Sequence, residues 1–430
     1  YKGYNLQQKL NLKSTHIQEA HWRRGFQMNK VSFIFPGQGS QYVGMSKELW
    51  DNFTVVKRLF DEADDILGVK LSKLCFEGDS QELLQTMNAQ PALLTASLAA
   101  YYASREILEL EPQLLAGHSL GEYSALVCSG FFSLQDGLQI VRKRGMFMQQ
   151  ATANGVGTMV AVANVSASIL ESLCQEISTD RDVISIACHN SNNQYVLSGH
   201  TEPMARIVEQ IKRLEHSKVN YLTVSGPFHS ILMKPAADKL AAELKKIPLR
   251  KGRWPVVSNV TALPHDEFSI YDLLYKQMIS PVRWTDTMDY LYQNGITVAL
   301  ELGPRKVLGQ LMKERYPSIS TFSINTSSSL KEADKWLSKQ QTTRKFTLER
   351  LEEGFAAALI ARNRNGDYKQ HMEGVVYPSQ QIRNRINQLQ NHKNDTAYNA
   401  VNTEVLELIR TILTTKQVPE QEQQTILNMI

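Results

Sequence analysis

The chain has 430 residues, of which 42% are hydrophobic and 21% charged, and its formal net charge is only +4. This is an ordinary globular composition, the length suggests two or three domains or subdomains, and the weak charge gives no support for a nucleic-acid partner. Four scattered cysteines and ten histidines without ligand spacing indicate a reducing compartment and no metal site. No apolar run reaches about 18 residues, and the N-terminus lacks a signal peptide's apolar core, so we expect a cytoplasmic protein with no membrane partner.

The N-terminal segment differs from the rest of the chain. Residues 1–28 are rich in Gln and Lys, carry the whole net charge and show weak periodicity, so we predict a linker. The chain also begins without an initiator Met, which favours the hypothesis of a piece excised from a longer, multidomain polypeptide. A tag remnant or a local docking helix is the alternative for this segment.

Short apolar strands then alternate with helical patterns over residues 29–153. The run 31–35 is typical of a strand and ends at the loop 36–41, in which three of six residues are Pro or Gly. A second short strand is predicted at 114–116, and a helix over 134–151. This alternation predicts a parallel sheet covered on both faces, with a ligand site at the carboxyl edge of its strands.

A different order of elements occupies residues 154–224. Strands and helices follow one another there as β-α-β-β-α-β, the ferredoxin-like order, at 158–162, 167–177, 183–188, 194–198, 202–214 and 219–224. We therefore predict a small ferredoxin-like subdomain inserted into the larger α/β unit.

The larger unit resumes over residues 225–340, with strands expected at 254–259 and 298–302. From residue 341 to 430 the composition shifts toward Gln, Asn, Arg and Lys, which predicts a helical C-terminal extension or linker. Its two amphipathic helices are marked by Ile382, Ile386 and Leu389, and by Val405, Leu408, Ile409 and Ile412. Accessory helices that pack on the parent domain are favoured over helices that dock a partner.

The stretch Gly117-His118-Ser119-Leu120-Gly121 contains the Gly-x-Ser-x-Gly pattern. It lies between an apolar run and a helix-competent run, which is the context of a nucleophile elbow. A serine hydroxyl needs a base within hydrogen-bond reach, and His229, on a Gly-Pro loop just after the last insert strand, is the candidate. An ordinary turn serine is the alternative for the pattern alone.

Four separated motifs occur together, namely Phe35–Gln41, Gly117–Tyr123, Arg144-Gly145 and Gly226–Ser230. In order and spacing, residues 29–325 resemble the malonyl-CoA:acyl carrier protein transacylase family, which includes the acyltransferase domains of polyketide synthases. Further matches are Gln90–Leu94, Asn190-Ser191, Ser258–Thr261, Ser280–Thr285 and Glu301–Pro304. The resemblance implies a hydrolase-like parallel-sheet α/β core with a ferredoxin-like insert.

The resemblance also assigns roles around Ser119. The backbone amides of Gln38 and Leu120 are expected to form the oxyanion hole that acyl transfer needs. The sequence offers no obvious acid to orient His229. The family uses a backbone carbonyl for this purpose, and the matching position is Gln277, whose side chain is then expected to matter little.

Substrate contacts are expected from five further residues. Arg144 lies at the family's carboxylate-binding position, and a guanidinium can hold a carboxylate with two parallel hydrogen bonds. Phe228, together with Leu120 after the nucleophile, matches family members that take malonyl rather than branched units. His118, Gln90 and Asn190 are expected in supporting roles.

The implied reaction is a ping-pong transfer from malonyl-CoA through malonyl-Ser119 to the phosphopantetheine thiol of an acyl carrier protein, with no bound cofactor or metal. Tyr377-Pro378 and the helix that follows resemble segments found after acyltransferases acting in trans in polyketide pathways, so neighbouring synthase domains are further candidate partners. The closest alternative is an acyl hydrolase that clears stalled groups from carrier proteins. Arg144 favours transfer, because such hydrolases often lack it. A general esterase and a non-catalytic docking module are more distant alternatives.

Overall fold

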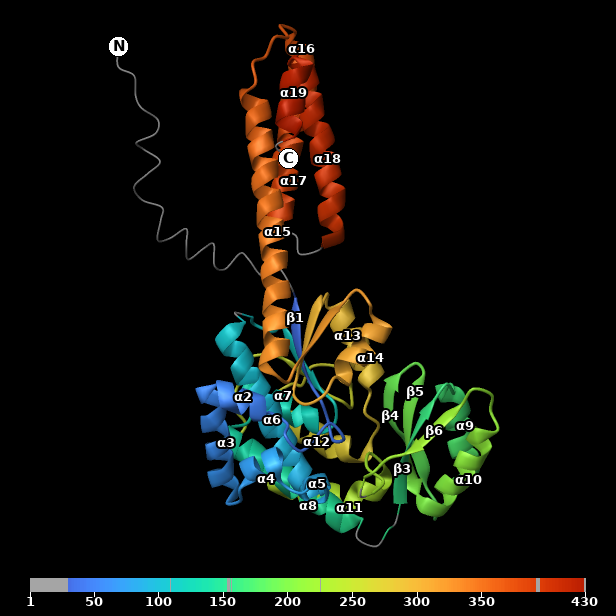
Figure 1. Cartoon of the computed structure of the whole chain (residues 1–430). Coiled ribbons are helices and arrows are strands. Elements are labelled where there is room, and N and C mark those ends of the chain that lie inside the picture. Colours follow the sequence, from blue (N-terminus) through green and yellow to red (C-terminus); the bar gives the residue numbers. More distant parts are fainter. Residues whose placement is uncertain are drawn as a thin grey trace. The chain divides into compact units, whose positions relative to one another are not determined.

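The computed structural model describes residues 30–108, 110–152, 155, 157–224, 226–391 and 395–428. The described residues form two compact units, one over 30–334 and one from 335 onward (Figure 1). The linker predicted over residues 1–28 lies outside the described residues. In the part of the chain that the structure describes, no helix combines the length and the apolar character that crossing a membrane requires.

A five-stranded parallel sheet forms the centre of the first unit. Its strand order is β7-β2-β1-β8-β9, with β1 at Val31–Phe35, β2 at Leu114–Gly117, β7 at Val256–Val257, β8 at Val298–Leu302 and β9 at Ser320–Ile324. Every residue of β1, β2 and β8 is buried, as expected for a parallel sheet covered on both faces. Phe35 pairs with Gly117, so the carboxyl ends of β1 and β2 lie side by side. The predicted hydrolase-like core is confirmed.

Helices flank this sheet (Figure 1). The longest, α6 at Thr86–Ile107, is buried on nearly all sides and packs against α7 and α8, as its Ala- and Leu-rich sequence predicts. The other helices of this layer are α2 (Lys47–Asn52), α3 (Thr54–Leu67), α4 (Leu71–Glu77), α5 (Ser80–Leu84), α7 (Leu120–Ser129), α8 (Leu134–Ala151), α11 (Lys234–Leu244), α12 (Ile270–Ile279), α13 (Trp284–Gln293) and α14 (Leu308–Arg315). A 3-10 turn, η1, spans Ile231–Met233.

The inserted segment folds as an antiparallel sheet of order β4-β5-β3-β6. Its elements are β3 (Gly157–Ala163), α9 (Ala167–Ile177), β4 (Ile184–Ser191), β5 (Gln194–His200), α10 (Thr201–Lys212) and β6 (Lys218–Tyr221). Apolar residues of α9 and α10 share one core with β3, β4 and β5. Both the element order and the strand order are ferredoxin-like, which agrees with the sequence prediction.

The second unit is helical. It comprises most of α15 (Ser327–Ile360), then α16 (Tyr368–His371), the π-helical turn η2 (Met372–Val376), α17 (Tyr377–Asn391), α18 (Asp395–Thr415) and α19 (Glu420–Leu427). Ile382 and Ile386 of α17 and Ile409 of α18 are buried in one cluster with Leu351 of α15. The amphipathic faces predicted to pack on the parent domain therefore lie in a core that this unit forms by itself.

Candidate active site

Ser119 lies in a strained turn between β2 and α7. Its backbone φ of 52° and ψ of −104° are uncommon for a residue with a side chain. Two contacts of Asn259 hold this turn, since its Oδ1 accepts from the Ser119 amide at 2.7 Å and its Nδ2 donates to the Gly117 carbonyl at 2.7 Å. A Cβ on Gly121 would lie 2.0 Å from the Phe35 carbonyl oxygen, so only glycine lets the helix start against β1.

The Ser119 hydroxyl contacts His229. Its Oγ lies 2.7 Å from His229 Nε2, and Nδ1 of the same ring lies 2.8 Å from the backbone oxygen of Gln277. A carbonyl can only accept, so Nδ1 carries the proton and Nε2 of the neutral ring accepts from the serine hydroxyl. Burial, reinforced by nearby Arg144, lowers the pKa of His229 to about 3. The ring is therefore neutral near pH 7, as a general base must be.

Arg144 of α8 lies on the other side of the Ser119 hydroxyl. Its Nη2 donates to Ser119 Oγ at 3.2 Å and to Gln277 Oε1 at 3.0 Å, and only 1% of the residue is exposed. The guanidinium also stands 5.3 Å from the centre of the Tyr123 ring, a cation–π distance. Its Nε is buried and has no hydrogen-bond partner among the described residues, so the protein's contacts there do not use every donor of the guanidinium. Burial lowers the pKa of Arg144.

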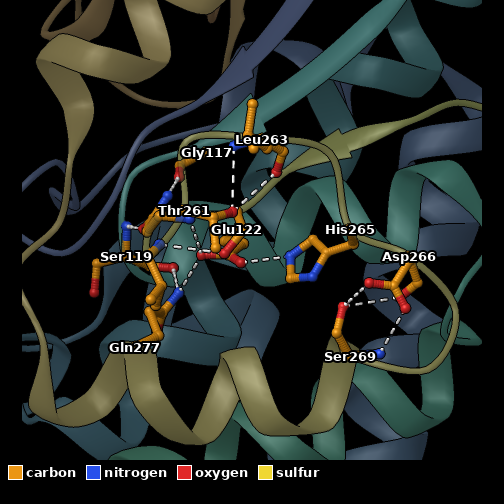
Figure 2. Close-up of polar contacts among 12 residues, drawn as sticks. Gly117, Ser119, Glu122, Thr261, Leu263, His265, Asp266, Ser269 and Gln277 are labelled. Carbon is orange, nitrogen blue, oxygen red and sulfur yellow. Dashed lines mark hydrogen bonds and ion pairs between the residues drawn. The ribbon is translucent and has the colours of Figure 1, made fainter.

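The side chain of Gln277 joins several parts of the site, contrary to our expectation that it would matter little. Its Oε1 accepts from Arg144, while its Nε2 donates to the Ser119 carbonyl at 2.9 Å and to Glu122 Oε2 at 2.7 Å. Figure 2 shows this amide between Ser119 and Glu122. The residue is fully buried, so truncating it would leave several polar groups without partners.

The two predicted oxyanion donors belong to adjacent segments. Leu120 is the first residue of α7, and a backbone N–H at this position has no carbonyl acceptor within the helix. Gln38 follows β1 in the Pro-Gly loop, and the neighbouring elbow is joined to β1 by the His118 amide, which donates to the Phe35 carbonyl at 3.0 Å. The Gln38 side chain donates to Thr86 Oγ1 at 3.3 Å. The end of β1 and the elbow therefore lie next to each other, and the oxyanion roles of the Leu120 and Gln38 amides stay predictions.

The other four residues expected to contact substrate are less directly connected to Ser119. His118 Nε2 lies 2.9 Å from Asn190 Oδ1, a contact between the elbow and β4 of the small sheet, and burial lowers the pKa of His118. Gln90 donates to the Met148 sulfur at 3.3 Å, while its buried Oε1 has no partner among the described residues. Phe228 is buried next to His229.

A second buried pair lies behind the elbow and was missed from the sequence. Glu122 Oε1 is 2.6 Å from His265 Nε2, and both side chains are fully buried (Figure 2). The backbone N–H of Asn259 donates to Glu122 Oε2 at 3.1 Å. Glu122 and Asn259 both belong to stretches that matched the family, but nothing in the sequence pairs them with each other or with His265.

Comparison with known proteins shows similarity to acyltransferases. The acyl transferase domain family matches residues 32–356. A malonyl CoA-acyl carrier protein transacylase of Bacillus subtilis is 38% identical over 405 residues, covering 93% of this chain and 100% of the relative. A protein of the same name from Bacillus subtilis strain 168 is 42% identical over 299 residues, which are 69% of this chain and 94% of the relative. A malonyl-transacylase solved in complex with a type II PKS acyl-carrier protein is 38% identical, with a TM-score of 0.69, and the match covers 71% of this chain and 99% of that one.

Proposed function

The chain belongs to the malonyl CoA-acyl carrier protein transacylase family, and from this membership and the site geometry we propose that it transfers a malonyl group from malonyl-CoA to an acyl carrier protein. The observation that carries the proposal is the position of Ser119 Oγ, 2.7 Å from a neutral histidine and 3.2 Å from a buried arginine. The first neighbour supports nucleophilic attack, and the second supports recognition of an acyl group with its own carboxylate.

The first half-reaction uses the hydrogen bonds described above. His229 Nε2 takes the proton of Ser119, whose Oγ attacks the thioester carbonyl, and the backbone amides of Leu120 and Gln38 stabilise the oxyanion. The intermediate collapses, the CoA thiolate leaves with the proton from His229, and malonyl-Ser119 remains with its carboxylate on Arg144. The phosphopantetheine thiol of the carrier protein then attacks the ester by the reverse path, which completes a ping-pong cycle.

The biosynthetic setting is a finer part of the proposal. A polyketide pathway in which the enzyme acts in trans, beside other domains of a synthase, is supported by the likeness to a malonyl-transacylase bound to a type II PKS acyl-carrier protein. The sequence around Tyr377-Pro378 supports the same setting. Fatty acid synthesis is the alternative setting, and it uses the same half-reactions.

One experiment tests transfer against hydrolysis. The protein is incubated with malonyl-CoA or acetyl-CoA, and the mass of the peptide that contains Ser119 is read with and without a phosphopantetheinylated carrier protein. We expect a malonyl adduct that disappears as malonyl carrier protein forms. An adduct that yields free malonate at the same rate in both samples identifies an acyl hydrolase.

Arg144→Ala tests the origin of selectivity. Because the variant leaves the malonyl carboxylate unpaired in a buried site, kcat/KM for malonyl-CoA should fall by about a hundredfold or more, equivalent to a few kcal/mol. Acetyl-CoA lacks that carboxylate and should lose little. If both substrates lose the same factor, Arg144 has a structural role and the malonyl assignment loses its main support.

A further inference from the structure

Arg144 is a cation that the fold has removed from water, and such a charge is costly unless an anion balances it. Its Nη2 donates to Gln277 Oε1 at 3.0 Å, and the other end of that amide donates to Glu122 Oε2 at 2.7 Å. A single amide therefore joins the buried guanidinium to the buried Glu122 carboxyl.

The hydrogen bonds of Glu122 indicate its charge. Oε2 accepts from the backbone N–H of Asn259 and from Gln277 Nε2, and both of these groups can only donate. Oε1 contacts His265 Nε2, while His265 Nδ1 is buried without a partner among the described residues. If Glu122 were protonated and donated to Nε2, the ring proton would lie on Nδ1, facing no acceptor. A carboxylate that accepts from Nε2–H leaves no proton unpaired, so Glu122 is ionised beside a neutral His265.

The loop from Ser258 to His265 brings both of these donors to Glu122. It leaves β7, reverses through Ala262, which has a φ of 55°, and returns so that the His265 amide donates to the Val256 carbonyl at 2.8 Å. A non-glycine residue in the left-handed region is strained, and the fold retains that strain here. The result is that Asn259 and His265, six residues apart, both donate to Glu122.

We propose that Glu122 is the resident counter-ion of Arg144, acting through the Gln277 amide, and that an acyl carboxylate arriving at Arg144 competes with Glu122 for that charge. Glu122 is thus a positioning residue, because it acts through Gln277 and Arg144. The competition rests on the proposed function, whereas the counter-ion role concerns the protein without substrate. With Glu122 present, Arg144 is balanced before substrate arrives.

Glu122→Gln removes the charge and can retain every hydrogen bond. The new amide oxygen can accept from Asn259 and Gln277, and the new NH₂ group can donate to His265 Nε2 once the ring proton moves to Nδ1. That proton has no acceptor, a cost that is the same with or without Arg144. In the presence of Arg144 we expect this substitution to lower the melting temperature by several degrees, because a buried cation is left unbalanced. In an Arg144→Gln background the same substitution should lower the melting temperature much less, because it then removes an unbalanced anion and only the cost of the buried Nδ1–H remains.

This difference between the two backgrounds is the test, and it uses no substrate, so it is independent of the proposed function. An equal loss in both backgrounds overturns the counter-ion role, because Glu122 would then act only as a structural acceptor. If Glu122→Gln alone does not fold, the double variant decides, since the loss of the unbalanced cation should let it fold; a double variant that stays unfolded overturns the proposal.

The second measurement addresses the competition. Sodium malonate should raise the melting temperature of Glu122→Gln more than that of the wild type, and KM for malonyl-CoA should fall while KM for acetyl-CoA stays unchanged. Glu301→Gln is the matched control, because Glu301 is also buried and accepts from three backbone amides, at Val307, Leu308 and Gly309. It should lose stability without a changed response to malonate. An equal malonate response in all three proteins overturns the competition.

Discussion

At the scale of single residues, the protonation of His229 decides whether Ser119 can be activated. Burial and Arg144 hold the pKa of His229 at about 3 in the folded protein, against an ordinary value of about 6.5 in an unfolded chain. Between those two pH values the unfolded chain binds a proton that the folded protein does not. The contribution of His229 to the free energy of unfolding is therefore fully present above pH 6.5. It is lost progressively as the pH is lowered toward 3.

This linkage gives a measurable prediction. Urea unfolding at pH 7.5 and 5.5 should show that the wild type loses about 1 kcal/mol more stability on acidification than His229→Asn does. The variant has no imidazole at this position, so the difference isolates one group from the other histidines. An identical pH dependence of the two proteins would mean that His229 titrates normally in the folded state.

Gln277 contacts His229 through its backbone carbonyl and joins Arg144 to Glu122 through its side chain. We therefore expect a larger effect of substituting this side chain than the sequence alone indicated. Gln277→Ala retains the backbone carbonyl that orients His229 but removes the amide between Arg144 and Glu122. We expect kcat/KM for malonyl-CoA to fall at least tenfold, with a smaller loss for acetyl-CoA and about 1–3 kcal/mol of lost stability from unpaired buried groups. A variant with wild-type kinetics for both substrates would restore the view that only the backbone matters.

The sequence offered two kinds of signal for the site residues. Ser119 lies in a local motif whose residue types indicate a nucleophile, and His229 is a candidate base on a nearby loop, whereas Arg144 was assigned from its match to the family's carboxylate-binding position. The roles of Glu122, Asn259 and His265 come from contacts with residues distant in sequence, since Asn259 and His265 both lie more than 130 residues from Glu122. A buried carboxylate on a helix looks, in sequence, like any acidic residue in a first turn, so its partners emerge only from the fold.

At the scale of elements, the predicted limits are correct where the hydrophobic periodicity ends at turn-forming or helix-capping residues. The helix at 134–151 and the strand at 298–302 have the predicted limits. The strand expected over 254–259 shrinks to Val256–Val257, because the chain turns immediately to bring Asn259 to the elbow. The strand β9 was not predicted; its sequence, Ser320–Ile324, is half polar and its first four residues are only partly buried.

The elbow depends on how closely α7 begins against β1, which gives a prediction for this helix. Gly121→Ala should cost about 3 kcal/mol or more, because the new Cβ meets the Phe35 carbonyl oxygen and no flexible side chain can yield. Gly130→Ala, at the other end of α7, is the control. Its φ is 90° and its Cβ would meet nothing within 4 Å, so it should cost only about 1 kcal/mol of backbone strain. Chemical denaturation of both variants measures the contrast, and equal losses would count against the close approach.

At the scale of the whole molecule, the described site residues and the second helical unit belong to different parts of the chain. Ser119, His229, Arg144, Gln277 and Glu122 all lie within residues 30–334. The helices from residue 335 onward have a hydrophobic core of their own, and Lys416 donates to the Ala358, Leu359 and Ala361 carbonyls at the end of α15. The second unit thus has a hydrophobic core of its own and its own hydrogen bonds at the end of α15.

This division predicts that the first half-reaction does not need the C-terminal helices. A chain ending at residue 340 keeps both sheets, the elbow and the network around Arg144, so kcat/KM for acylation by malonyl-CoA should stay within a factor of about two of the intact protein. Acyl-enzyme mass after rapid quenching measures this step, and the same truncation with Ser119→Ala gives the background. Transfer to a carrier protein is measured separately on the same samples. If a folded truncated protein acylates ten times more slowly, the second unit contributes to the chemistry at Ser119; if only transfer slows, it contributes to the carrier protein's access.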